Sequence, residues 1–208
     1  MIAYEATIDF LGVLILLYGF VIIAENYIHS VIRHLQAQTI ILSLLIGIVG
    51  FYLRMWELVA LAIFTLIFRA WLIPEILLKD IKREGVWEHR EFGAKAKSSL
   101  IAGIITAIVG IIAYLVIYNV IGTWKGMIPF ILLLFGLLII VMRRNALAQI
   151  SGYIVEENAL LYLGIVLYPI GFLLEVGILL DVIGAVLLAV ILSAEKEYGP
   201  MEIEELAG

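Results

Sequence analysis

Apolar runs of about 18 or more residues recur along the whole chain, and they restrict its fold more than any other feature. A helix needs about 20 mostly apolar residues to cross the roughly 30 Å hydrocarbon core of a bilayer. Hydrophobic residues make up 64% of the 208 residues, against about 45–50% in soluble domains. The sequence therefore predicts an all-α polytopic membrane protein.

Seven apolar segments are separated by polar turns, which predicts seven transmembrane helices. The fifth is short, and the stretch 25–38 is polar on one side and can continue the second helix into the interface. The first run lacks a basic segment before it and a small-residue cleavage site after it, so we expect a retained span rather than a signal peptide. The seven segments are 6–24, 37–53, 56–78, 100–120, 128–141, 148–168 and 173–193.

Basic residues are distributed unequally between the two sets of alternate loops, which predicts the orientation. One side of the membrane has only Arg54 and Lys125. By the positive-inside rule the other side is cytoplasmic, so we expect a multi-pass protein of the cell membrane with its N-terminus outside and its C-terminus inside. The basic residues of that other side are Arg33, Lys79, Lys82, Arg83, Arg90, Lys95, Lys97, Arg143, Arg144 and Lys196.

The predicted spans group into two three-helix units. Segment 16–23 aligns with segment 133–140, and each leads into a polar turn and another span. Such a match indicates an internal duplication, although apolar segments also match by chance, and both explanations stay open. The expected organisation is listed by range: a three-helix unit (1–78), a charged cytoplasmic connector (79–99), a linking helix (100–124), a second three-helix unit (125–195) and an acidic tail (196–208).

Several function classes are excluded by residues that the chain lacks. Cysteine is absent, which excludes thiolate-ligated iron–sulfur clusters and disulfides in this chain. The seventh span has no lysine for a retinal Schiff base. We expect His29, His34 and His89 to be surface residues of cytoplasmic loops rather than ligands, and we expect no cofactor in this chain. The acidic tail does not indicate a nucleic-acid partner.

Ionisable residues inside the apolar spans are the candidate functional residues. Each costs about 2.5–3.5 kcal/mol on insertion scales unless it is paired or hydrated. At 1.5 Å per residue, Arg69 of the third span and Glu157 of the sixth lie roughly 14 Å from the cytoplasmic side, and Asp181 of the seventh roughly 18 Å. Glu156 adjoins Glu157, and Glu175 begins the seventh span. We therefore expect a charged layer at mid-membrane.

This layer has two interpretations. Carboxylates on different helices, with water between them and Arg69 nearby, can pass protons. Alternatively, Arg69 closes a salt bridge that only sets the register of the helices, because buried pairs are weak evidence for more. Glu156 and Glu157 point about 100° apart, so one is expected to line an interior path and the other to meet a neighbouring helix or subunit. Pro74 predicts a distortion near the end of the third span.

Several of these motifs together resemble the membrane subunit called hydrogenase-4 component E over nearly the whole chain. They are the turn Arg143–Arg144–Asn145, the pairs Gly152–Tyr153 and Glu157–Asn158, the run Glu175–Val–Gly–Ile, Asp181, and Arg69 five residues before Pro74. The second three-helix unit is also similar to the K-type subunit of complex I and to the C subunit of Mrp antiporters. In the K-type subunit the first intramembrane acid follows the glycine that matches Gly152 by two residues. This chain has Ile154 at that position.

The resemblance implies a non-catalytic membrane subunit of a complex-I-related [NiFe]-hydrogenase of the formate hydrogenlyase type. Its nickel site and iron–sulfur clusters would lie on partner subunits, and its neighbours would be antiporter-like membrane subunits. Arg69, Glu157, Asp181, Glu175 and Glu156 would then belong to a path for H⁺ or Na⁺. The alternatives are a structural spacer, a subunit of an Mrp-type cation/proton antiporter, or a free-standing solute transporter.

Overall fold

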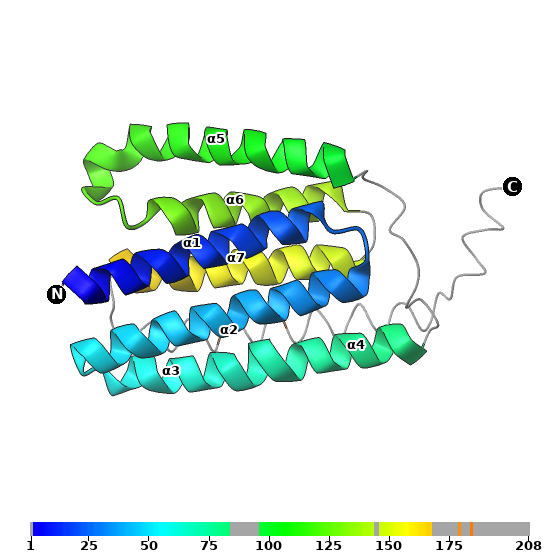
Figure 1. The fold of residues 1–208 in the computed structure, drawn as a ribbon, viewed down its shortest axis with the longest axis horizontal. Helices are drawn as coiled ribbons and strands as arrows, with labels where there is room; N and C mark the ends of the chain where they lie inside the picture. The colour runs from blue at the N-terminus through cyan, green and yellow to red at the C-terminus, as the bar shows by residue number, and fades with distance from the viewer. Residues whose placement is uncertain (1, 84–95, 144–145, 168–178, 180–183, 185–208) are drawn as a thin grey trace, which may run out of the picture.

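The computed structural model describes residues 2–83, 96–143, 146–167, 179 and 184. In this part of the chain, long helices lie side by side with their axes roughly parallel (Figure 1). The seventh predicted span falls outside the described residues apart from Leu179 and Gly184. The helices are listed by their bounds: α1 (Ile2–Ala24), α2 (Ile28–Leu53), α3 (Trp56–Ile67), η1 (Phe68–Leu72), α4 (Ile73–Arg83), α5 (Ala96–Ile121), α6 (Met127–Met142) and α7 (Ala146–Leu167).

Among the described residues, five helical segments are long and apolar enough to cross a membrane, and the shorter α6 is also apolar. The five segments are Tyr4–Ala24, Ile28–Leu53, Trp56–Lys79, Ser98–Ile121 and Ala148–Leu167. The chain is thus a helical membrane protein, as the apolar runs predicted. The expected extension of the second span toward its N-terminus is also observed, because α2 already begins at Ile28.

The third predicted span differs from expectation around Pro74. The helix does not end near this proline: α3, η1 and α4 follow one another without a break from Trp56 to Arg83. The distortion is a π-helical segment, Phe68–Leu72, that directly precedes Pro74 within the helix. A proline is tolerated inside a membrane helix where the local hydrogen bonding adjusts to its missing N–H, and a π-turn is one such adjustment.

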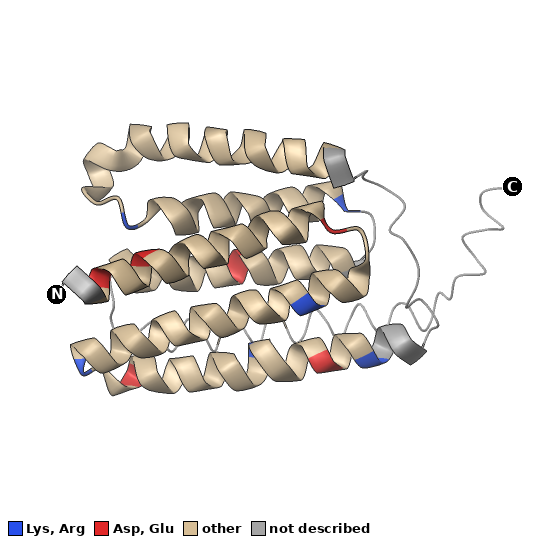
Figure 2. Cartoon of the chain, viewed as in Figure 1, with Lys and Arg blue, Asp and Glu red and all other residues tan. Residues whose placement is uncertain are grey.

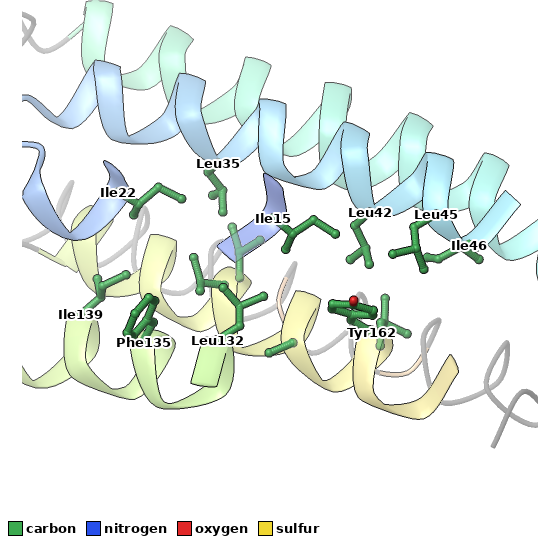
Figure 3. Packing of buried hydrophobic residues seen from close by; sticks show 14 of the residues in the cluster. Ile15, Ile22, Leu35, Leu42, Leu45, Ile46, Leu132, Phe135, Ile139 and Tyr162 are labelled. Atoms are coloured by element: carbon green, nitrogen blue, oxygen red, sulfur yellow. The ribbon is translucent and has the colours of Figure 1, made fainter. Parts of the chain in front are cut away.

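The central helices of the described bundle are α2 and α7. In their most apolar stretches 50% and 61% of the residues are buried, whereas the corresponding value for α5 is 17%. Figure 1 shows α5 at the edge of the bundle, next to α6. The apolar core fills the space between α1, α2, α6 and α7, where Ile15, Leu42 and Phe135 are fully buried (Figure 3).

Charged residues gather at the two ends of the helices, and few lie between (Figure 2). The end that holds the α1–α2 turn and the end of α6 carries Arg33 and Arg143; we call it the basic end. The opposite end holds the first turns of α1, the α2–α3 turn at Arg54 and the α5–α6 turn at Lys125. The side of the membrane on which each end lies remains a prediction.

Candidate functional site

An ion pair between Arg69 of η1 and Glu157 of α7 is enclosed in the bundle. The Nη2 atom of Arg69 lies 3.5 Å from Oε2 of Glu157. The two residues are 1% and 3% exposed, so both charges are shielded from lipid. Counting residues from the span ends placed them at equal depth, and the structure shows that the two side chains meet.

The π-turn orients Arg69 toward the interior. The N–H of Ile73 donates to the carbonyl of Phe68, five residues earlier, which widens this turn by one residue. Arg69 and Ala70 are buried, whereas Phe68 and Trp71 on either side are exposed. The widened turn therefore directs the guanidinium inward while the adjacent aromatic side chains face outward.

Glu157 has two further neighbours. The side chain of Tyr153, one turn earlier on α7, lies close enough to the carboxylate of Glu157 to interact with it. Gly184 lies beside the same carboxylate, because a methyl group added to it would be 3.5 Å from Oε1 of Glu157. Arg69, Tyr153 and Glu157 thus form one polar cluster. Asp181 and Glu175, two of the predicted ion-path residues, lie outside the described residues.

The two adjacent glutamates of α7 face different surroundings, as their 100° separation predicted. Glu157 points to Arg69. Glu156 is half-buried and borders α6, since a methyl group on Gly136 would come within 2.8 Å of its Cβ. Glu156 therefore lies at the α6–α7 contact, away from the ion pair.

A chain of buried amide and hydroxyl groups begins at Asn158, the residue after Glu157, and the sequence interpretation did not include it. Nδ2 of Asn158 donates to Oγ1 of Thr39 at 3.0 Å and lies 3.4 Å from Oε1 of Gln38. Nε2 of Gln38 donates to the carbonyl of Ile15 at 3.1 Å, and Thr39 donates to the carbonyl of Leu35. Gln38, Thr39 and Asn158 are completely buried. This amide chain links α7 to α2 and α1.

Arg143 lies directly after the end of α6, in the turn where the sequence placed it, and it also has a structural role. It is 5% exposed and donates to the carbonyls of Ile23 at 2.9 Å and Glu25 at 2.6 Å. Those carbonyls belong to the end of α1, whose last C=O groups have no partner within the helix. A cation is stabilising near the C-terminus of a helix, and this preference could have indicated the contact from the sequence.

The histidines of the described part differ in position from their expected loops. His29 and His34 lie in α2, and Nε2 of His34 is 3.8 Å from Oε2 of Glu25. Among the described residues, no group of three or more His, Asp or Glu side chains is placed to hold a metal ion.

The chemistry available at the candidate site is that of a carboxyl group beside a permanent cation. An arginine side chain keeps its proton in proteins, whereas a carboxyl group can bind and release one. Arg69 can thus supply a fixed positive charge and Glu157 a group that exchanges a proton or contacts a cation. No family model, curated protein or solved structure matches the chain.

Proposed function

We propose that this chain is an ion-path subunit of a complex-I-related, membrane-bound [NiFe]-hydrogenase, in which Glu157 exchanges a proton or Na⁺ and Arg69 is its fixed counter-charge. The observation that carries the proposal is the ion pair between these residues, enclosed between η1 and α7. Ionisable side chains enclosed in a membrane protein are expensive, and they commonly mark ion and proton pathways.

The assignment to a hydrogenase rests on the resemblance to hydrogenase-4 component E. The chain has no cysteine, so cysteine-ligated clusters and the nickel site would be held by partner subunits. In this proposal seven spans cross the cell membrane with the N-terminus outside. The chain would couple electron transfer on the partners to ion movement, with Asp181, Glu175 and Glu156 as further members of the path.

A structural spacer is the second candidate, and the amide chain favours it. Gln38, Thr39 and Asn158 join three helices through buried hydrogen bonds, which fixes the relative position of α1, α2 and α7. In this alternative Arg69 and Glu157 set the register between η1 and α7, and no ion passes between them.

The two candidates differ in the effect of Glu157→Gln in the assembled complex. This variant keeps the size of the side chain and removes its titratable group. The ion path predicts normal hydrogenase activity with a soluble electron donor and loss of the associated ion gradient. Glu75→Gln is the control, because Glu75 forms an exposed pair with Lys79, and it should leave both measurements unchanged.

A normal gradient in the Glu157→Gln complex would support the spacer and contradict the ion path. Whether the complex is a hydrogenase is tested separately by purification of the tagged chain from its native membrane in mild detergent. Co-purification of a nickel-containing oxidoreductase supports the proposal. Isolation of the chain alone would favour a free-standing transporter.

A further inference from the structure

A pocket of about 210 Å³ opens between α1, α2 and α7 at the end of the bundle opposite to the basic end. Its walls are apolar and include Ile8, Val49 and Ile165. Its charged residues are Glu5, Asp9 and Lys125. The pocket therefore combines a hydrophobic wall with charged side chains, of which Asp9 lies inside the predicted first span.

The charges of this pocket favour a cation. Nζ of Lys125 lies 3.4 Å from Oε1 of Glu5, and these two charges offset each other. Asp9 makes no ion pair with any residue that the structure describes. The pocket thus keeps one negative charge, which raises the local concentration of cations and lowers that of anions.

The hydroxyl of Tyr162 lies next to this pocket, one helical turn from the pocket-lining Ile165 of α7 and against Gly12 of α1. Tyr162 is 2% exposed, and its hydroxyl occupies the space beside Gly12, where an added methyl group would overlap it. Gly12 is one turn beyond Asp9 on α1, and Tyr162 is one turn before Ile165 on α7. Asp9 is close enough to the Tyr162 hydroxyl to interact with it electrostatically.

The next turn below Tyr162 reaches the amide chain. Asn158 is four residues earlier on α7, and Oδ1 of its buried side chain has no hydrogen-bond partner among the described residues. Buried polar atoms without protein partners commonly bind ordered water. Asn158 directly follows Glu157. Buried polar side chains therefore follow one another along α7 from Tyr162 to Asn158, and Asn158 is the neighbour of Glu157 along the helix.

We propose that this pocket is the mouth of a hydrated path by which a monovalent cation, H⁺ or Na⁺, reaches Glu157 from the end opposite to the basic end. Asp9 attracts the cation, and the Tyr162 hydroxyl and the amide chain hold the water. This inference rests on the proposed function, because it assigns the route by which ions reach the same site.

Charged thiol reagents test the mouth directly, because the chain contains no cysteine of its own. Single variants Ile8→Cys and Phe10→Cys are made in the full chain in its native membrane. Ile8 is 9% exposed and lines the pocket, whereas Phe10, two residues later on α1, is 62% exposed on an apolar surface. The cationic reagent MTSET should modify Ile8→Cys at least tenfold faster than Phe10→Cys. Equal rates, or protection of Ile8→Cys, would overturn the proposal.

The preference of the pocket for a cationic over an anionic thiol reagent tests the role of Asp9. One negative charge about 6 Å away changes the ratio of the rates for a cationic and an anionic reagent by about tenfold in water. In Ile8→Cys the ratio of the MTSET rate to that of the anionic reagent MTSES should fall by about this factor when Asp9→Asn is added. An unchanged ratio contradicts the assignment of Asp9 as the attracting group.

Tyr162→Phe tests the path next to the pocket and separates this inference from the proposed function. In the assembled complex it should slow gradient formation several-fold with hydrogenase activity unchanged, whereas Glu157→Gln abolishes the gradient. Loss of the gradient only in Glu157→Gln would contradict this route and leave the proposed function intact. An accessible, cation-selective pocket together with a normal gradient in Glu157→Gln would overturn the proposed function but not the pocket.

Discussion

Arg69 and Glu157 illustrate how a buried ion pair can be essential to a fold without strengthening it. Moving two charges out of water costs about as much free energy as their mutual attraction returns. Removal of one partner is different, because the remaining charge then lies in an apolar interior. The stability of the bundle should therefore respond to single changes and far less to a paired change.

We predict that Arg69→Met lowers the free energy of unfolding by about 3–5 kcal/mol, since it leaves the Glu157 carboxylate without its cation. The double variant Arg69→Met with Glu157→Leu should recover most of this loss. Thermal unfolding in detergent measures both. Lys79→Ala is the control, and it should change stability by less than about 1 kcal/mol because its pair with Glu75 is exposed. A double variant that is less stable than Arg69→Met would contradict this account.

A second prediction concerns the close contact between Gly12 and Tyr162. A methyl group at Gly12 would overlap the Tyr162 hydroxyl, so Gly12→Ala should destabilise the bundle by about 1–3 kcal/mol through overpacking. Tyr162→Phe removes the overlapping oxygen and should restore part of the loss. A double-mutant cycle on thermal unfolding measures the coupling, and strictly additive effects would show that the two residues do not interact.

The residues of the candidate site were predictable to different degrees. Arg69 and Glu157 stand out because charges are rare inside apolar spans, and counting residues gives their depth. Their neighbours are decided by the packing of helices that are distant in sequence. Gln38 and Asn158 are ordinary polar residues when each is read alone, and only the contact between α2 and α7 reveals the amide chain.

At the scale of elements, the contact between α6 and α7 depends on two glycines. A methyl group on Gly136 would lie 2.7 Å from the backbone nitrogen of Glu156, and one on Gly152 would lie 3.0 Å from the backbone oxygen of Gly136. Small residues allow membrane helices to approach this closely and to gain packing energy along their backbones. This contact also fixes the position of the α7 backbone at Glu156, the residue before Glu157.

We predict that Gly136→Ala separates α6 from α7 and lowers the free energy of unfolding by about 1–3 kcal/mol. Gly47→Ala is the matched control, because its methyl group would meet Ala62 at 3.6 Å, an ordinary contact. Thermal unfolding in detergent compares the two. Equal stability of both variants would show that the close approach at Gly136 is not needed.

The helices of the described residues were predicted well, because an apolar run can satisfy its backbone hydrogen bonds in lipid only as a helix. Which helices pack against one another was not predicted. Helix α5 is apolar along its length, so its sequence does not distinguish a face that meets lipid from a face that meets α1 and α6. The π-turn was also unforeseen, although Pro74 marked its position within three residues.

At the scale of the whole molecule, the distribution of charge is the property that bears on orientation. The basic end of the described bundle carries Arg33 and Arg143, and the opposite end carries Arg54 and Lys125, of which Lys125 is paired with Glu5. Arg143 is buried against the end of α1, so its charge also stabilises the fold. The asymmetry nevertheless persists in the remaining loops, which keeps the prediction that the basic end is cytoplasmic.

This orientation predicts which side of the membrane exposes each end. Arg33→Cys and Trp124→Cys lie at opposite ends of the bundle, and both positions are exposed. In intact cells a membrane-impermeant maleimide should label Trp124→Cys and not Arg33→Cys, and inverted membrane vesicles should give the reverse. The mouth proposed at Asp9 would then open outside the cell, so ions would move between that side and Glu157. The reverse labelling pattern would place the mouth on the cytoplasmic side and invert the predicted direction of access, because the pocket is fixed to the end of the bundle that carries Lys125.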